Sequence, residues 1–164
     1  MKKTLIAYFS LEHSEPVGIT HEVALDIQKL TDGDLFRIEP VDPYPETFKE
    51  VNKEAALKKR ENIRPRLKRY LDNLDGYQTV FLAYPNYWGT MPMEVFAFVE
   101  SLDFTGKKVY PICTHEGSGL GYSVIDLKNM IGESVLGEAL ALEKSQIASG
   151  GGSLRKYIEG IFDD

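Results

Sequence analysis

The stretch with the clearest chemical character is residues 85–90, in which Tyr87 and Trp88 follow an apolar run and precede a helix that opens near Met91. Open α/β sheets bind ligands outside the carboxyl ends of their strands, so a loop in this position can lay an aromatic ring against a planar ligand. The same two side chains also suit a plainer role, as half-buried aromatics that cover the edge of a sheet. The loop is therefore a candidate binding site, and its own residues do not name the ligand.

Two other loops have a composition suited to ligand binding. Residues 10–20 contain serine, threonine, histidine, glutamate and glycine and lead into a helical pattern, whereas residues 114–121 are rich in glycine and contain His115 and Glu116. Each loop follows an apolar run of strand length. In a doubly wound sheet with strand order 2-1-3-4-5, the ends of strands one, three and four lie side by side, so the three loops are expected to share one rim.

The hydrophobic pattern predicts strands that alternate with helices. Strands are expected at residues 5–9, 34–39, 79–84, 107–113 and 134–142. Residues 5–9 are apolar without alternation, which is typical of a central strand covered on both faces. Helices are expected to end near Thr31, to span 46–60, to form briefly around 67–71, and to occupy about 91–102, 124–131 and 154–161. This order predicts a parallel sheet with right-handed crossovers.

Length and composition limit the class of protein. The 164 residues suit one domain, 1–164, and the net charge of −6 argues against nucleic-acid binding, which depends on neutralising phosphates. There is no run of about 18 apolar residues and no signal-peptide pattern, so we expect no membrane association and a cytoplasmic location. The lone Cys113 cannot form an internal disulfide.

Three segments make the chain resemble the flavodoxin-like family of small FMN-binding oxidoreductases over nearly its full length. They are residues 5–10, 84–92 and 113–121, of which the second and third are the more specific. The resemblance implies a flavodoxin-like three-layer α/β sandwich, with a five-stranded parallel sheet in the order 2-1-3-4-5 and helices on both faces. It also implies that the loop after the first strand binds the FMN phosphate and that the loops after the third and fourth strands flank the isoalloxazine ring.

Carried over position by position, the resemblance assigns the phosphate to Ser10, Gly18, Ile19 and Thr20. It assigns the ring to residues on the other two loops, namely Pro85, Asn86, Tyr87, Trp88, Gly89, Thr90, His115, Glu116, Gly117, Ser118 and Gly119. Free N–H groups and the dipole at a helix amino terminus favour a bound phosphate. Trp88 or Tyr87 would stack on the flavin and Asn86 would bond its edge, while His115 would bond the flavin or a substrate, or else cap the glycine-rich loop.

The first loop departs from the family pattern. Residues 11–17 are inserted, Ile19 replaces the usual Asn, and Glu12 and Glu15 bring negative charge that opposes a phosphate. Two interpretations follow: the insertion bulges into solvent and leaves the phosphate site intact, or phosphate affinity is reduced or lost. Glu116 adds a further acidic group, which would disfavour an anionic reduced flavin.

The sequence therefore supports two hypotheses of function. The first is an FMN-dependent oxidoreductase or electron carrier, with NAD(P)H or quinone reduction implied by resemblance and with a redox partner protein or a small-molecule acceptor. The second is a flavodoxin-fold protein with weakened or lost FMN binding that serves as a binding or partner-docking module. Either protein could be a monomer or a homodimer.

Other sequence features favour simpler roles. Cys113 and the histidines lack the spacing of a zinc site, and Ser10 or Ser118 with His115 lacks the pattern of a nucleophile elbow. Cys113 itself suits buried packing. The basic segment 58–69 suits a solvated helix face or a docking site for an acidic partner.

Overall fold

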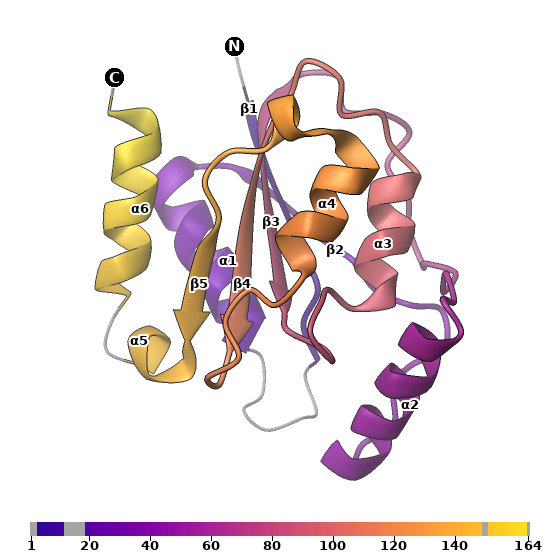
Figure 1. Cartoon of the computed structure of the whole chain (residues 1–164). Helices are drawn as coiled ribbons and strands as arrows, with labels where there is room; N and C mark the ends of the chain where they lie inside the picture. Colours follow the sequence, from indigo (N-terminus) through magenta and orange to yellow (C-terminus); the bar gives the residue numbers. More distant parts are fainter. Residues whose placement is uncertain (1–2, 12–18, 149–150, 164) are drawn as a thin grey trace.

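The computed structural model describes residues 3–11, 19–148 and 151–163 (Figure 1). Within these residues, five strands form one parallel sheet in the order β2-β1-β3-β4-β5. The strands are β1 (Lys3–Tyr8), β2 (Asp34–Arg37), β3 (Tyr77–Pro85), β4 (Lys108–His115) and β5 (Leu140–Glu143). The predicted flavodoxin-like topology is therefore confirmed.

Helices cover both faces of the sheet, as Figure 1 shows. They are α1 (Ile19–Thr31), α2 (Phe48–Arg60), α3 (Met93–Glu100), α4 (Ser123–Ile131), α5 (Lys144–Ala148) and α6 (Gly152–Phe162), with a 3₁₀ turn η1 (Glu133–Val135) before β5. Helices α1 and α6 pack on one face, and α3 and α4 lie on the other. Helix α2 projects beyond the carboxyl ends of the strands, so it stands beside the edge where the three loops are expected to meet.

The sheet separates two apolar clusters, one on each face. Along β1, Leu5 and Ala7 point into the cluster with α3 and α4, whereas Ile6 and Tyr8 point into the cluster with α1 and α6. All four side chains are buried. A strand that is apolar on both faces is therefore explained by burial on both sides, as the sequence predicted.

The fifth strand is shorter than predicted, because 134–142 begins as the η1 turn and β5 proper spans Leu140–Glu143. Leu136 makes one isolated parallel bridge with Val109. At Gly137 the backbone runs directly against the ring of Tyr110, where an added Cβ would lie 2.2 Å from a ring carbon. This close approach accompanies a break in the ladder, and regular pairing starts again only at Leu140.

The short helix predicted around 67–71 is wrong. Leu67 instead forms an antiparallel bridge with Pro40, and its backbone N–H donates to the Tyr70 hydroxyl at 3.0 Å. The N–H of Lys68 donates to the Glu39 carbonyl at 2.8 Å. In return, the N–H of Val41 donates to the Arg66 carbonyl at 2.8 Å. Residues 66–68 therefore pair with residues 39–41, a distant segment that no local periodicity could indicate.

None of the helices in the described part of the chain is long and apolar enough to cross a membrane.

Candidate functional site

A cavity of about 480 Å³ lies at the carboxyl ends of β1, β3 and β4. Its size falls within the range of roughly 300–1,000 Å³ that is usual for small-molecule sites. The predicted site residues that line it are Ser10, Ile19, Thr20, Pro85, Asn86, Tyr87, Trp88, Gly89, His115, Glu116 and Ser118. The structure therefore brings all three predicted loops to one cavity, although Gly18 lies outside the described residues.

Three predicted site residues, Thr90, Gly117 and Gly119, are not among the lining residues. Thr90 is buried, and its hydroxyl donates to the Asp126 carboxylate. The Gly117 N–H and the Gly119 carbonyl each bond another loop residue. These three positions therefore take part in hydrogen bonds that shape the loops, without lining the cavity themselves.

Residues 85–90 form a tight turn organised by Asn86. Its Oδ1 accepts from the Gly89 N–H at 2.9 Å, and its Nδ2 donates to the Gly119 carbonyl at 2.9 Å. The Asn86 side chain thus joins the loop after β3 to the loop after β4. Trp88 has a φ of +55°, a left-handed conformation that non-glycine residues seldom adopt and that is found preferentially at functional sites.

The two aromatic side chains of this turn have different surroundings. The Tyr87 ring is partly buried and lies edge-on to Phe9, with 5.9 Å between ring centroids. The Trp88 side chain is 54% exposed, and its indole Nε1–H donates to the Asn52 carbonyl at 3.1 Å. The Trp88 indole therefore offers a large exposed surface while α2 fixes its orientation.

The predicted phosphate end of the cavity combines a helix start with two hydroxyl residues. The Ser10 hydroxyl accepts from the His21 N–H at 3.2 Å, so it caps the first turn of α1. The Thr20 hydroxyl bonds the Thr114 hydroxyl at 2.9 Å, which ties α1 to the end of β4. Leu11 lines the cavity, whereas the rest of the predicted insertion, residues 12–17 with Glu12 and Glu15, lies outside the described residues.

His115 caps the loop after β4, because its Nδ1 accepts from the Gly117 N–H at 2.9 Å. The capping role predicted as one alternative for this residue is confirmed. With Nδ1 acting as an acceptor, the neutral ring carries its proton on Nε2. Glu116 at the same rim lies 3.8 Å from Lys144, a cation that offsets part of its negative charge.

Burial disfavours a reactive cysteine at this edge. Cys113 is fully buried, and burial raises the pKa of its thiol to about 12, so it stays protonated at neutral pH. The prediction that Cys113 serves packing is confirmed.

Burial, followed by the charge of Glu94, raises the pKa of the Tyr87 hydroxyl. Within residues 3–11, 19–148 and 151–163, no cluster of His, Cys, Asp and Glu could hold a metal ion.

Sequence reasoning missed the contribution of α2. Phe48, Val51 and Asn52 line the cavity from this helix. The charged composition of 46–60 predicts a surface helix with a narrow apolar stripe, which is correct for the buried Val51 and Ala55. That pattern contains no signal for the helix standing beside the carboxyl ends of the strands.

The basic segment 58–69 is largely engaged within the molecule. Several of its cations contact acidic, carbonyl or aromatic groups. Examples are Lys58 with Glu94, Lys59 with the Trp88 carbonyl, Arg64 with Glu100, Lys68 with Glu39, and Arg69 with the Phe36 ring. Much of this charge therefore serves internal contacts.

Comparisons with known proteins agree with this fold. A family model described as flavodoxin matches residues 3–160. A candidate flavoprotein from Bacteroides uniformis is 25% identical, with a TM-score of 0.81 over 96% of this chain and 98% of that chain. Another from Bacteroides eggerthii is 28% identical, with a TM-score of 0.75 over 91% and 95% of the two chains.

A third solved structure, a flavoprotein in complex with FMN from Lactobacillus acidophilus, is 17% identical, with a TM-score of 0.69 over 91% of this chain and 98% of that chain. At this identity the likeness concerns the fold. Among proteins of curated function, none matches the sequence significantly.

Proposed function

The chain belongs to the flavodoxin family, and we propose that it binds FMN in the cavity at the carboxyl ends of β1, β3 and β4 and acts as a flavin-dependent oxidoreductase or electron carrier. The observation that carries the proposal is the meeting of three independently predicted loops in one cavity. In this cavity, segments that are far apart in the sequence place the amino terminus of a helix beside aromatic side chains. These are the features that an anionic group joined to a planar ring requires.

Two ends of the cavity would hold the two parts of the cofactor. The first turn of α1, at Ile19 and Thr20, presents backbone N–H groups and a favourable dipole to a phosphate, with Ser10 alongside. The exposed indole of Trp88 supplies a surface on which a flat ring can stack, and His115 lines the same cavity. The fit to FMN is therefore good for the described residues.

The bound flavin would supply the redox chemistry, and the chain's own residues would bind and orient it. Apolar and aromatic groups of the wall, including Phe48, Val51 and Trp88, would exclude water from one side of the ring. The family resemblance favours NAD(P)H or a quinone-type compound as the reaction partner. The FMN complex of the related Lactobacillus acidophilus flavoprotein supports the choice of cofactor.

FMN binding is tested by titrating the apoprotein with FMN and following flavin fluorescence. We expect saturable quenching, and the absence of quenching at high micromolar FMN would contradict the proposal. Riboflavin, which lacks the phosphate, is the matched control ligand. At least tenfold tighter binding of FMN, equivalent to about 1.4 kcal/mol, would show that the phosphate end works despite Glu12 and Glu15. Equal and weak affinities would favour the alternative of a flavodoxin-fold binding module.

A further inference from the structure

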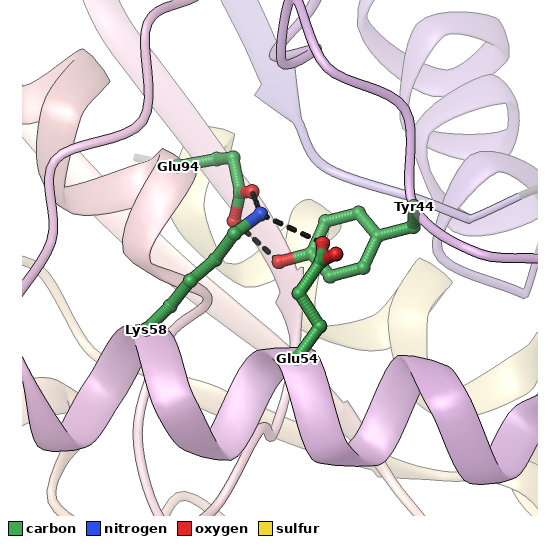
Figure 2. A network of polar contacts seen from close by, with 4 residues as sticks. All are labelled: Tyr44, Glu54, Lys58 and Glu94. Carbon is green, nitrogen blue, oxygen red and sulfur yellow. Dashed lines mark hydrogen bonds and ion pairs between the residues drawn. The ribbon is translucent and has the colours of Figure 1, made fainter.

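A network of polar contacts joins α2 to the first turn of α3, as Figure 2 shows. At its centre is the Glu94 carboxylate, whose side chain is 0% exposed. The Tyr44 hydroxyl donates to Glu94 Oε1 at 2.8 Å, and Lys58 Nζ donates to Glu94 Oε2 at 2.9 Å. Lys58 Nζ also lies 3.1 Å from Glu54 and 3.9 Å from the centroid of the Tyr44 ring. The three connected segments are the loop after β2, α2 and α3.

Generic stabilisation does not account for this arrangement. Replacing a buried ion pair by well-packed apolar residues is often neutral or stabilising, because both charges lose their hydration when they are buried. Removing only one partner is strongly unfavourable, since the other charge then stays buried alone. The network does tie three segments together at fixed contact points, one of which is on α2.

The apolar contact of helix α2 with the rest of the protein is narrow. Its buried residues are Val51 and Ala55, and the remainder of the helix is partly or fully exposed. Phe48 and Val51 nevertheless line the cavity, and the Asn52 carbonyl accepts the indole N–H of Trp88. Helix α2 therefore forms one wall of the cavity and also bonds Trp88, the aromatic residue on the neighbouring wall.

A second contact makes Trp88 a direct reporter of the position of α2. The Lys59 ammonium bonds the main-chain carbonyl of Trp88, while the Trp88 indole N–H donates to the carbonyl of Asn52, about two turns earlier on the same helix. Both the backbone and the side chain of Trp88 are therefore held by α2. Because Trp88 is the only tryptophan in the sequence, its fluorescence monitors this contact without interference from other tryptophans.

We propose that Glu94, acting through Lys58 and Tyr44, is a positioning residue that holds α2 as a wall of the cavity and keeps Trp88 in place for its ligand. The part of this inference that concerns the ligand rests on the proposed FMN site. The part that concerns α2 and Trp88 holds for the apoprotein and is tested separately. Glu94 itself need not touch the cofactor.

The test uses Glu94→Gln, which keeps the size of the side chain and an oxygen for the Tyr44 hydroxyl but removes the charge that Lys58 bonds. Lys58 can still pair with Glu54, so the variant does not leave an isolated buried ammonium. In the apoprotein we expect acrylamide to quench Trp88 fluorescence about twice as efficiently and the emission maximum to move to longer wavelength. At the proposed FMN site, we expect the Kd for FMN to be about tenfold higher in the variant than in wild type.

Two further variants keep the outcome decisive. Tyr44→Phe removes the other hydrogen bond to Glu94 without a change of charge, and we expect changes in the same direction; it also serves if Glu94→Gln does not fold. Glu100 is on the same helix, α3, and forms a more exposed ion pair with Arg64. Glu100→Gln removes that ion pair, and we expect the quenching of Trp88 fluorescence to stay unchanged. Far-ultraviolet circular dichroism checks that each variant is folded.

Each result decides one part of the proposal. Trp88 quenching that is the same in wild type, Glu94→Gln and Tyr44→Phe would overturn the positioning role, whatever happens to FMN. Altered quenching with an unchanged FMN Kd would overturn the role of the α2 wall in ligand binding. If wild type binds no FMN, the proposed function fails, while the quenching data still decide whether Glu94 positions α2.

Discussion

The substitution Asn86→Ala should loosen the turn that joins two sides of the cavity. Asn86 Oδ1 accepts from the Gly89 N–H and Asn86 Nδ2 donates to the Gly119 carbonyl, each at 2.9 Å. A hydrogen bond of this kind contributes about 1 kcal/mol net, and a partly buried group left without its partner adds to the loss. We therefore expect the free energy of unfolding to fall by about 2–3 kcal/mol.

For a chain of this size, such a loss corresponds to a fall in Tm of roughly 4–12 °C. Urea denaturation of the apoprotein, followed by circular dichroism, measures the loss directly. The matched control is Asn73→Ala, because Asn73 Oδ1 also accepts from a backbone N–H, that of Asp75 at 2.9 Å, but on an exposed turn. We expect that control to cost under about 1 kcal/mol.

The comparison refutes the reasoning if Asn86→Ala destabilises the protein no more than Asn73→Ala. Such a result would mean that the two loops keep their positions without the amide bridge. A loss of FMN affinity that accompanies the expected destabilisation would further indicate that the bridge sets the shape of the cavity. FMN affinity and stability are therefore measured on the same preparations.

Three other predictions follow from the geometry of the site. Trp88→Ala should weaken FMN binding by roughly 2- to 12-fold, the effect of an aromatic contact of about 0.5–1.5 kcal/mol, and an unchanged Kd in the fluorescence titration would rule out Trp88 as the stacking residue. Cys113 should resist iodoacetamide at pH 8 until the protein is unfolded, because its pKa is raised to about 12 and little thiolate forms below that pH; rapid alkylation of the folded protein would contradict this. Gly121→Ala should lower the free energy of unfolding by about 2–4 kcal/mol, since the φ of Gly121 is +55° and the new Cβ would lie 2.2 Å from the Gly89 oxygen. Gly76 has a φ of +86° but open space around it, so Gly76→Ala should lower it by only about 1 kcal/mol. Thermal unfolding measures both losses.

The fold was predictable because its signals are local. The apolar run at 5–9, which continues past β1, and the apolar run before residue 85 each indicate a strand without reference to the rest of the chain. Their alternation with helices then limits the topology, because parallel crossovers have one hand and ligand loops gather at one edge. The meeting of Ser10, Tyr87 and His115 in one cavity follows from that topology.

The errors occurred where distant segments compete with local preference. Residues 67–71 have a helical spacing of apolar side chains, yet the backbone of Leu67 and Lys68 pairs with residues 39–41. The predicted strand at 134–142 is interrupted where Gly137 meets the ring of Tyr110. In both cases the deciding contact comes from a part of the chain that a window of ten residues does not contain.

Glu94 shows the same limit within the candidate site. In the sequence it is an acidic residue in the first turn of a helix, where interaction with the helix dipole is a sufficient explanation for a solvent-exposed carboxylate. The structure instead buries it completely against Tyr44 and Lys58, which lie 50 and 36 residues earlier in the chain. The only local sign is its setting, since Met93, Val95 and Phe96 beside it are all buried. A charged residue flanked on both sides by core residues should therefore be examined for a buried partner before it is assigned to the surface.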